Sequence, residues 1–217
     1  MKRTNRRAFL ATTVTGTAAL VAGAWGRADD AKPQTSLAAL ILAGGQMAMA
    51  QARYAAMARQ ADADGYGQAA SLFRAAARSK EANVTDLGAV IKKLGGKLEC
   101  DAKPGEVKST KENVAALIKA ETEAGETTLP ELVAVAREEK NKEAVRALNY
   151  AKAAAAEYAT LFAEAAADLE AWKAGKKSVY VCTVCGFPAY TLPEKKCPTC
   201  FDALDKFETA TRGEARL

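Results

Sequence analysis

The sequence predicts a mainly α-helical protein, an antiparallel four-helix bundle followed by a small C-terminal module built around four cysteines. Two observations lead to this prediction. Residues 36–173 are rich in alanine and poor in proline, and their apolar residues recur at the three- and four-residue steps of a helix. Residues 179–208 then carry two C-x-x-C pairs, a spacing typical of one tetrahedral metal site.

Start and stop signals divide the bundle region into four predicted helices. Residues 64–67 form a glycine-containing turn, and Gly95 ends the second helix. Ser109 and Glu112 form a capping box that opens the third helix, and Pro130 predicts a kink within it. Short turns with one longer connection indicate antiparallel neighbours. The helices are expected at residues 36–63, 68–94, 109–139 and 142–173.

Cys182, Cys185, Cys197 and Cys200 are the strongest chemical signal in the chain. Each C-x-x-C pair fits a tight turn that points two sulfurs inward, and a bound metal would fix all four as thiolates. Tetrahedral sulfur suits zinc, as a structural clip, or a single iron, as a one-electron carrier. Two local disulfides are the alternative, but four converging cysteines outside any βαβ pattern favour a metal.

Residues 1–28 predict an export signal. A basic start precedes a short apolar run over residues 11–24, and Ala28 supplies a small residue for cleavage. The core from Arg6 to Leu10 resembles a twin-arginine signal, a route that exports folded proteins, so we expect a periplasmic location. A membrane anchor is the alternative, but the run is short for a span and dilute in large apolar residues.

Removing this segment changes the charge of the chain. The full sequence holds 31 basic and 26 acidic residues. Residues 1–28 contain five basic residues and no acid, which leaves 31 − 5 = 26 basic residues against 26 acidic ones. The mature chain is formally neutral, and we expect neither a nucleic-acid partner nor a stable membrane span after cleavage.

Three polar residues fall on the apolar stripes of the predicted helices. Lys80 and Asn83 lie on the stripe of the second helix, and Glu121 lies on that of the third. Burying a lysine or a glutamate is costly unless the two charges are paired. The alternative is a wider stripe from which Lys80 extends to solvent.

The cysteine module resembles the rubredoxin-like domain at the C-terminus of rubrerythrins. The resemblance rests on residues 179–187, on Cys197-Pro198-x-Cys200 and on residues 206–208. It implies that the four cysteines bind one iron per chain, with zinc possible instead. Phe201 departs from the family, which usually has a small residue there. A positive φ at that position would strain a phenylalanine.

The helical region resembles the ferritin-like domain of the same family, which normally holds two irons between its helices. The resemblance implies which residues stand at the family's iron-ligand positions, and only one of them, Glu121, is a carboxylate. The chain also contains no histidine. We therefore predict no di-iron centre. We expect Lys80 to face Glu121 across the former site, with Asn83 and Tyr158 completing a hydrogen-bond network. The ligand positions fall on Met47, Lys80, Asn83, Glu121, Ala124, Ala155 and Tyr158.

These features predict an exported rubrerythrin-like protein that transfers one electron at an Fe(Cys)4 centre and lacks di-iron peroxidase activity. A redox partner protein and a homodimer formed through the bundle are expected. Two alternatives remain: a structural module clipped by zinc, and an enzyme whose bundle binds another metal or ligand through Glu121, Glu157 and Tyr158. The lone Cys100 is expected to be a small, partly buried residue.

Overall fold

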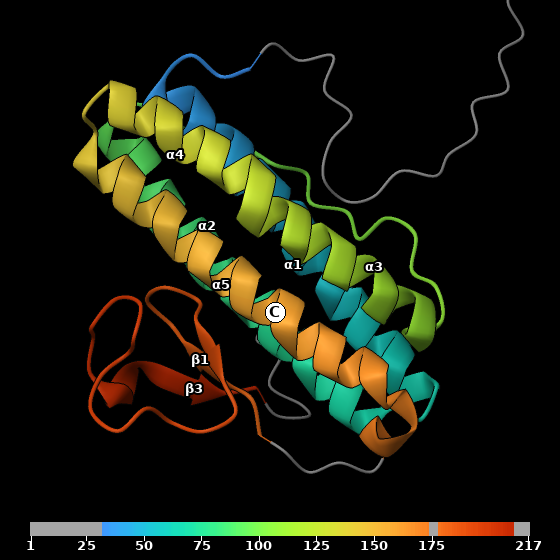
Figure 1. Cartoon of the computed structure of the whole chain (residues 1–217). Coiled ribbons are helices and arrows are strands. Elements are labelled where there is room, and N and C mark those ends of the chain that lie inside the picture. The colour runs from blue at the N-terminus through green and yellow to red at the C-terminus, as the bar shows by residue number, and fades with distance from the viewer. Residues whose placement is uncertain (1–31, 174–177, 211–217) are drawn as a thin grey trace, which may run out of the picture.

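The computed structural model describes residues 32–173 and 178–210 and confirms the predicted architecture (Figure 1). The twin-arginine segment at residues 1–28 lies outside the described residues. Antiparallel helices pack into a bundle, and a small sheet lies against one side of it. No helix in the described ranges is long and apolar enough to cross a membrane. The long helices are α1 (Ser36–Ala63), α2 (Gly67–Lys93), α3 (Thr110–Glu123), α4 (Leu129–Glu138) and α5 (Lys142–Ala167).

Side-chain caps fix where three of these helices begin. The Thr35 hydroxyl accepts a hydrogen bond from the N–H of Ala38 at 3.2 Å, and Asn141 caps α5 in the same way. Ser109 and Glu112 form the predicted capping box at the start of α3. These contacts satisfy backbone donors that a helix start leaves without intrahelical partners.

The irregularity predicted at Pro130 begins before that residue. A π-helical turn, η1 (Ala124–Thr128), separates α3 from α4, and the N–H of Leu129 bonds back to the carbonyl of Ala124. Pro130 lies in the first turn of α4, where its missing N–H costs little. The third predicted helix is therefore two helices joined by a widened turn.

The prediction that the fourth helix reaches residue 173 was wrong, because the α-helix ends six residues earlier. α5 ends at Ala167, and a short 3-10 helix, η2 (Leu169–Trp172), follows. Asp168 leaves helical geometry, with φ −147° and ψ 69°, and its carboxylate accepts a hydrogen bond from the N–H of Ala171. The aspartate thus ends one helix and caps the next.

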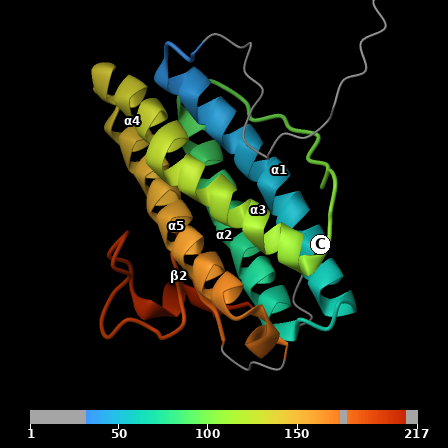
Figure 2. The same ribbon diagram turned by 45° about the vertical axis from the view of Figure 1, so that its right-hand side comes forward.

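The C-terminal module contains an antiparallel sheet of order β2-β1-β3. Its strands are β1 (Tyr180–Cys182), β2 (Pro188–Ala189) and β3 (Phe207–Thr209), and a 3-10 turn, η3 (Leu204–Lys206), leads into β3. Val179 and Val181 are buried in the same apolar cluster as Phe73 of α2 and Phe162 of α5. The sheet therefore shares a core with the bundle, and two views place it beside α2 and α5 (Figures 1 and 2).

Candidate metal centre

Two tight turns bring the four cysteines together. In the first turn the N–H of Gly186 donates to the carbonyl of Cys182 at 2.8 Å, and Gly186 has a φ of +77°. In the second the N–H of Phe201 donates to the carbonyl of Cys197 at 3.0 Å. Phe201 has a φ of +63°, so the phenylalanine occupies the left-handed conformation that favours glycine.

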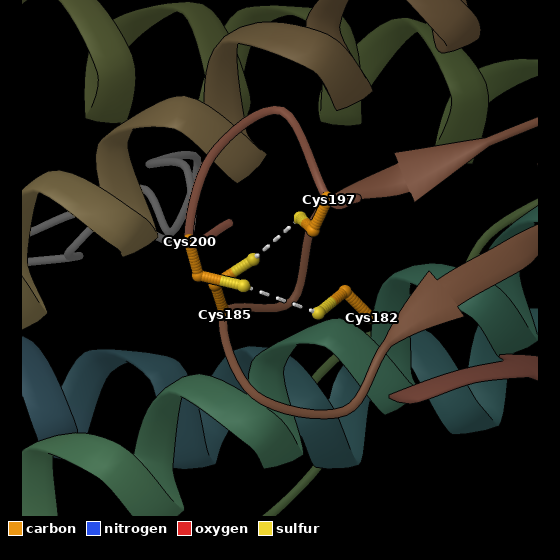
Figure 3. Close-up of side chains that lie close together, drawn as sticks. All are labelled: Cys182, Cys185, Cys197 and Cys200. Carbon is orange, nitrogen blue, oxygen red and sulfur yellow. Dashed lines mark hydrogen bonds between the residues drawn. The ribbon is translucent and has the colours of Figure 1, made fainter. Parts of the chain in front are cut away.

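The four sulfurs form a compact cluster (Figure 3). Cys182 Sγ lies 3.6 Å from Cys200 Sγ, and Cys185 Sγ lies 3.5 Å from Cys197 Sγ. All four sulfurs lie within 4.8 Å of one another. A tetrahedral ion with metal–sulfur bonds of about 2.3 Å needs sulfurs about 3.8 Å apart, so the cluster fits one zinc or iron. The sulfurs are much farther apart than the about 2.05 Å of a disulfide.

Burial and nearby N–H groups set the acidity of these thiols. The thiol of Cys182 has a pKa lowered to about 5. The lowering comes from hydrogen bonds that Cys182 receives from the Cys185 side chain and from the N–H groups of Cys185 and Val184. The bond to Cys182 and burial raise the pKa of Cys185, and burial raises that of Cys200 to about 12. One sulfur is thus already suited to be a thiolate, the form that binds metals.

One side of the cluster reaches the surface. Cys182, Cys185 and Cys197 are fully buried, whereas Cys200 is partly exposed. The adjacent Phe201 is 69 % exposed. Cys200 is therefore the cysteine of the cluster nearest to solvent.

Side chains of α2 hold the first cysteine turn against the bundle. The Ser79 hydroxyl donates to the carbonyl of Gly186 at 2.6 Å, and the Asn83 amide donates to that of Cys185 at 2.8 Å. Arg78 forms an ion pair with Glu208 of β3 at 2.8 Å. The expectation that Asn83 bonds to Lys80 and Glu121 was therefore wrong, because its amide faces the cysteine module instead.

A buried ion pair occupies the interior of the bundle. Lys80 Nζ lies 2.7 Å from Glu121 Oε2, and both side chains are 0 % exposed. The Tyr54 hydroxyl donates to Glu121 Oε1 at 2.6 Å. Burial and the charge of Glu121 raise the pKa of Tyr54 well above its usual value, which keeps the phenol neutral and donating. In the sequence Tyr54 lies at an apolar position of the first predicted helix, which gives no signal of this polar role.

Tyr158 does not join this pair. Its ring is fully buried and packs 6.2 Å from that of Phe162, centroid to centroid. Its hydroxyl makes no hydrogen bond to Lys80, Asn83 or Glu121, all of which lie in the described part of the chain. The expected network is thus made by Tyr54 in place of Asn83 and Tyr158.

The other residues singled out from the sequence have simpler surroundings. Met47, Ala124 and Ala155 are buried together in one apolar cluster. Glu157 is partly exposed, and burial and the charge of Glu164 raise its pKa. Cys100 is exposed, which corrects the expectation of partial burial, since its connection passes along the outside of α1 with the thiol 3.6 Å from the carbonyl of Gly45.

The rubrerythrin family model matches residues 48–166 of the chain. This chain belongs to the rubrerythrin family. The fold is also similar to solved structures of nigerythrin in mixed-valence, partially reduced and fully reduced, all-ferrous states. In that order, the sequence identities are 26 %, 25 % and 26 %, and the TM-scores are 0.76, 0.75 and 0.75. Each alignment covers 88 % of this chain and 94 % of the nigerythrin chain. No curated protein matches the chain.

The family match covers the second half of α1, all of α2, α3 and α4, and nearly all of α5, whereas the alignment with nigerythrin extends over most of the chain. This rubrerythrin-family protein therefore combines a four-helix domain with a four-cysteine cluster able to bind a metal, consistent with a rubredoxin-type iron site.

Proposed function

We propose that this protein transfers single electrons at one iron held by Cys182, Cys185, Cys197 and Cys200, and that its bundle holds no di-iron centre. An iron bound by four thiolates supplies one reversible electron. The observation that carries the proposal is the contrast between the two domains: four sulfurs meet in the module, whereas a lysine is paired with Glu121 in the bundle.

The residues inside the bundle support the loss of the second metal site. The chain contains no histidine, so it cannot form the Glu-x-x-His pairs that hold two irons in ferritin-like bundles. Among the residues that the structure describes, the cysteine cluster is the only group of three or more potential metal ligands. The Lys80 ammonium already neutralises Glu121 and would repel a cation.

Electrons would enter and leave beside Cys200. This cysteine is the ligand with an exposed edge, and Phe201 next to it offers an apolar contact to a redox partner protein. The bundle shields the opposite side of the cluster, because Ser79 and Asn83 bind the turn that carries Cys185.

The outer face of α1 is the proposed homodimer surface. Residues 36–52 contain no charged side chain, yet Ile41, Leu42 and Met49 are 37 %, 39 % and 44 % exposed. A helix apolar on all sides is normally covered, and a second copy of the same face would cover it. Leu42→Glu should convert dimers to monomers in sedimentation. Leu94→Glu, at a similarly exposed leucine just after the end of α2, should leave the dimer intact, and equal effects would refute this surface.

The proposal includes export of the folded, metal-loaded protein to the periplasm by the twin-arginine route, supported by the Arg6-Arg7 motif. Replacing both arginines with lysine should keep a tagged chain in the cytoplasm. Unchanged delivery to the periplasm would contradict this part of the proposal.

Absorption spectroscopy of the purified protein tests the electron-transfer role. The iron-loaded chain should be red through sulfur-to-iron charge transfer, and the colour should bleach on reduction and return on reoxidation. A colourless protein that holds one tightly bound zinc would instead support a structural module.

A further inference from the structure

Two side chains on one face of α2 bind consecutive carbonyls of the first cysteine turn. Ser79 donates to the carbonyl of Gly186 at 2.6 Å, and Asn83 donates to that of Cys185 at 2.8 Å. Residues four apart project from the same side of a helix, so α2 presents both donors together. Both bonds are buried, where hydrogen bonds are strong and well defined.

The contact between α2 and the turn is tight. A Cβ atom on Gly186 would lie 2.7 Å from the Ser79 hydroxyl and 2.8 Å from the Ser79 carbonyl. With its φ of +77°, Gly186 is a position that only glycine fits without strain. The turn is therefore held at a fixed distance from Ser79.

The two carbonyls belong to peptide groups whose N–H ends reach different acceptors. The Gly186 carbonyl shares its peptide with the N–H of Phe187, and that N–H hydrogen-bonds to the Cys185 sulfur. The Cys185 carbonyl shares its peptide with the N–H of Gly186, which donates to the carbonyl of Cys182 at 2.8 Å. Of these two bonds from α2, only the one from Ser79 reaches a peptide group whose N–H donates to a cysteine sulfur.

We propose that Ser79 is a positioning residue that tunes the metal centre from the bundle, by polarising the Gly186–Phe187 peptide and strengthening its N–H···S bond to Cys185. A carbonyl that accepts a hydrogen bond makes the N–H of the same peptide a better donor. A stronger donor at a ligand sulfur stabilises the more negative, reduced state of an iron–thiolate centre. Ser79 therefore raises the reduction potential, an effect that rests on the proposed iron site.

Redox titration of four iron-loaded full-length chains tests this tuning: the wild type, Ser79→Ala, Asn83→Ala and Ser71→Ala. Hydrogen-bond cooperativity of roughly 10–30 % per bond leads us to expect Ser79→Ala to lower the equilibrium constant for reduction by roughly two- to fourfold. That is about 18–36 mV at 59 mV per tenfold. Asn83→Ala removes a neighbouring contact without weakening a donor to sulfur, and should shift the potential less.

Ser71→Ala is the matched control on the same helix. The Ser71 hydroxyl bonds to the carbonyl of Gly67 within α2, and its loss should leave the potential unchanged. A potential unchanged in Ser79→Ala would overturn the proposal. So would equal shifts in Ser79→Ala and Asn83→Ala, because these would indicate loosened docking in place of tuning.

A second measurement does not depend on iron. In the cadmium-loaded chain, the Phe187 amide proton reports its bond to sulfur through its chemical shift and its coupling to 113Cd. Ser79→Ala should move this resonance upfield and reduce the coupling, and Ser71→Ala should change neither. A Phe187 signal unaltered by Ser79→Ala refutes the tuning. A native protein that holds zinc refutes the electron-transfer role but leaves this NMR result intact.

Discussion

Lys80 of α2 and Glu121 of α3 form a salt bridge of 2.7 Å inside the bundle, with neither side chain exposed. Apolar clusters lie on both sides of the pair: Ala76 and Leu117 belong to one, and Leu87 and Ala124 to the other. Charges in such an interior are stable only when they compensate each other. The pair therefore links two helices while keeping the interior electrically neutral.

Removing one member of this pair should be more harmful than removing both. Lys80→Met leaves Glu121 as an uncompensated buried charge, and Glu121→Met does the same to Lys80, so each should cost about 3–5 kcal/mol in unfolding free energy. The double variant leaves an apolar interior of similar volume and should be more stable than either single variant. Denaturant unfolding measures all four chains, and additive losses would contradict the pairing.

The Tyr54 hydroxyl should contribute more to stability than the Tyr158 hydroxyl. Tyr54→Phe removes a hydrogen bond to a buried carboxylate and should cost about 1.5–3 kcal/mol. Tyr158→Phe is the matched control, since it deletes the same atom from an equally buried ring that makes no hydrogen bond to Glu121. Equal losses in thermal or denaturant unfolding would show that Glu121 does not depend on Tyr54.

The fold was predictable because local signals determine the helices, whereas the facing of Lys80 and Glu121 was expected from the resemblance to the ferritin-like domain. Helix caps and glycine turns set the helix ends, and the stripe positions placed the two charges in the interior. The direction of Asn83 was not predictable, because a helical position does not reveal which neighbour covers it, and here that neighbour is the cysteine turn. Tyr54 was missed because a tyrosine on an apolar stripe looks like ordinary core.

Phe201 should carry a conformational cost that glycine relieves. At its φ of +63°, a non-glycine residue costs about 1–2 kcal/mol. Phe201→Gly should therefore slow metal loss to a chelator, measured from the decay of charge-transfer absorption. Phe201→Ala removes the ring but keeps the strain, so it should lose metal as fast as the wild type. Metal loss from Phe201→Gly that is no slower than from the wild type would refute the conformational cost, and a faster loss from Phe201→Ala than from the wild type would show that the ring protects the centre.

Asp64 should make stability depend on pH in the acid range. Its carboxylate accepts hydrogen bonds from the hydroxyl and the N–H of Thr110 at 2.7 and 2.9 Å, and these lower its pKa from 3.8. A lowered folded-state pKa favours the folded chain at higher pH. The wild type should have a higher free energy of unfolding than Asp64→Asn above about pH 5. This difference should vanish as the pH falls through the lowered folded-state pKa of Asp64.

Unfolding free energies measured between pH 7 and pH 2 check this dependence on Asp64. Asp101→Asn alters an exposed acid of the connection between α2 and α3 and is the control. An advantage over Asp64→Asn that persists at the lowest pH would refute the role of the charged carboxylate.

Iron analysis of the purified full-length protein tests the central claim most directly. We predict one iron per chain after expression with excess iron, and none bound in Cys182→Ser, whose helix content should stay nearly unchanged. Additional iron in the wild type, beyond one per chain, would place metal outside the four cysteines and contradict a bundle in which Lys80 neutralises Glu121.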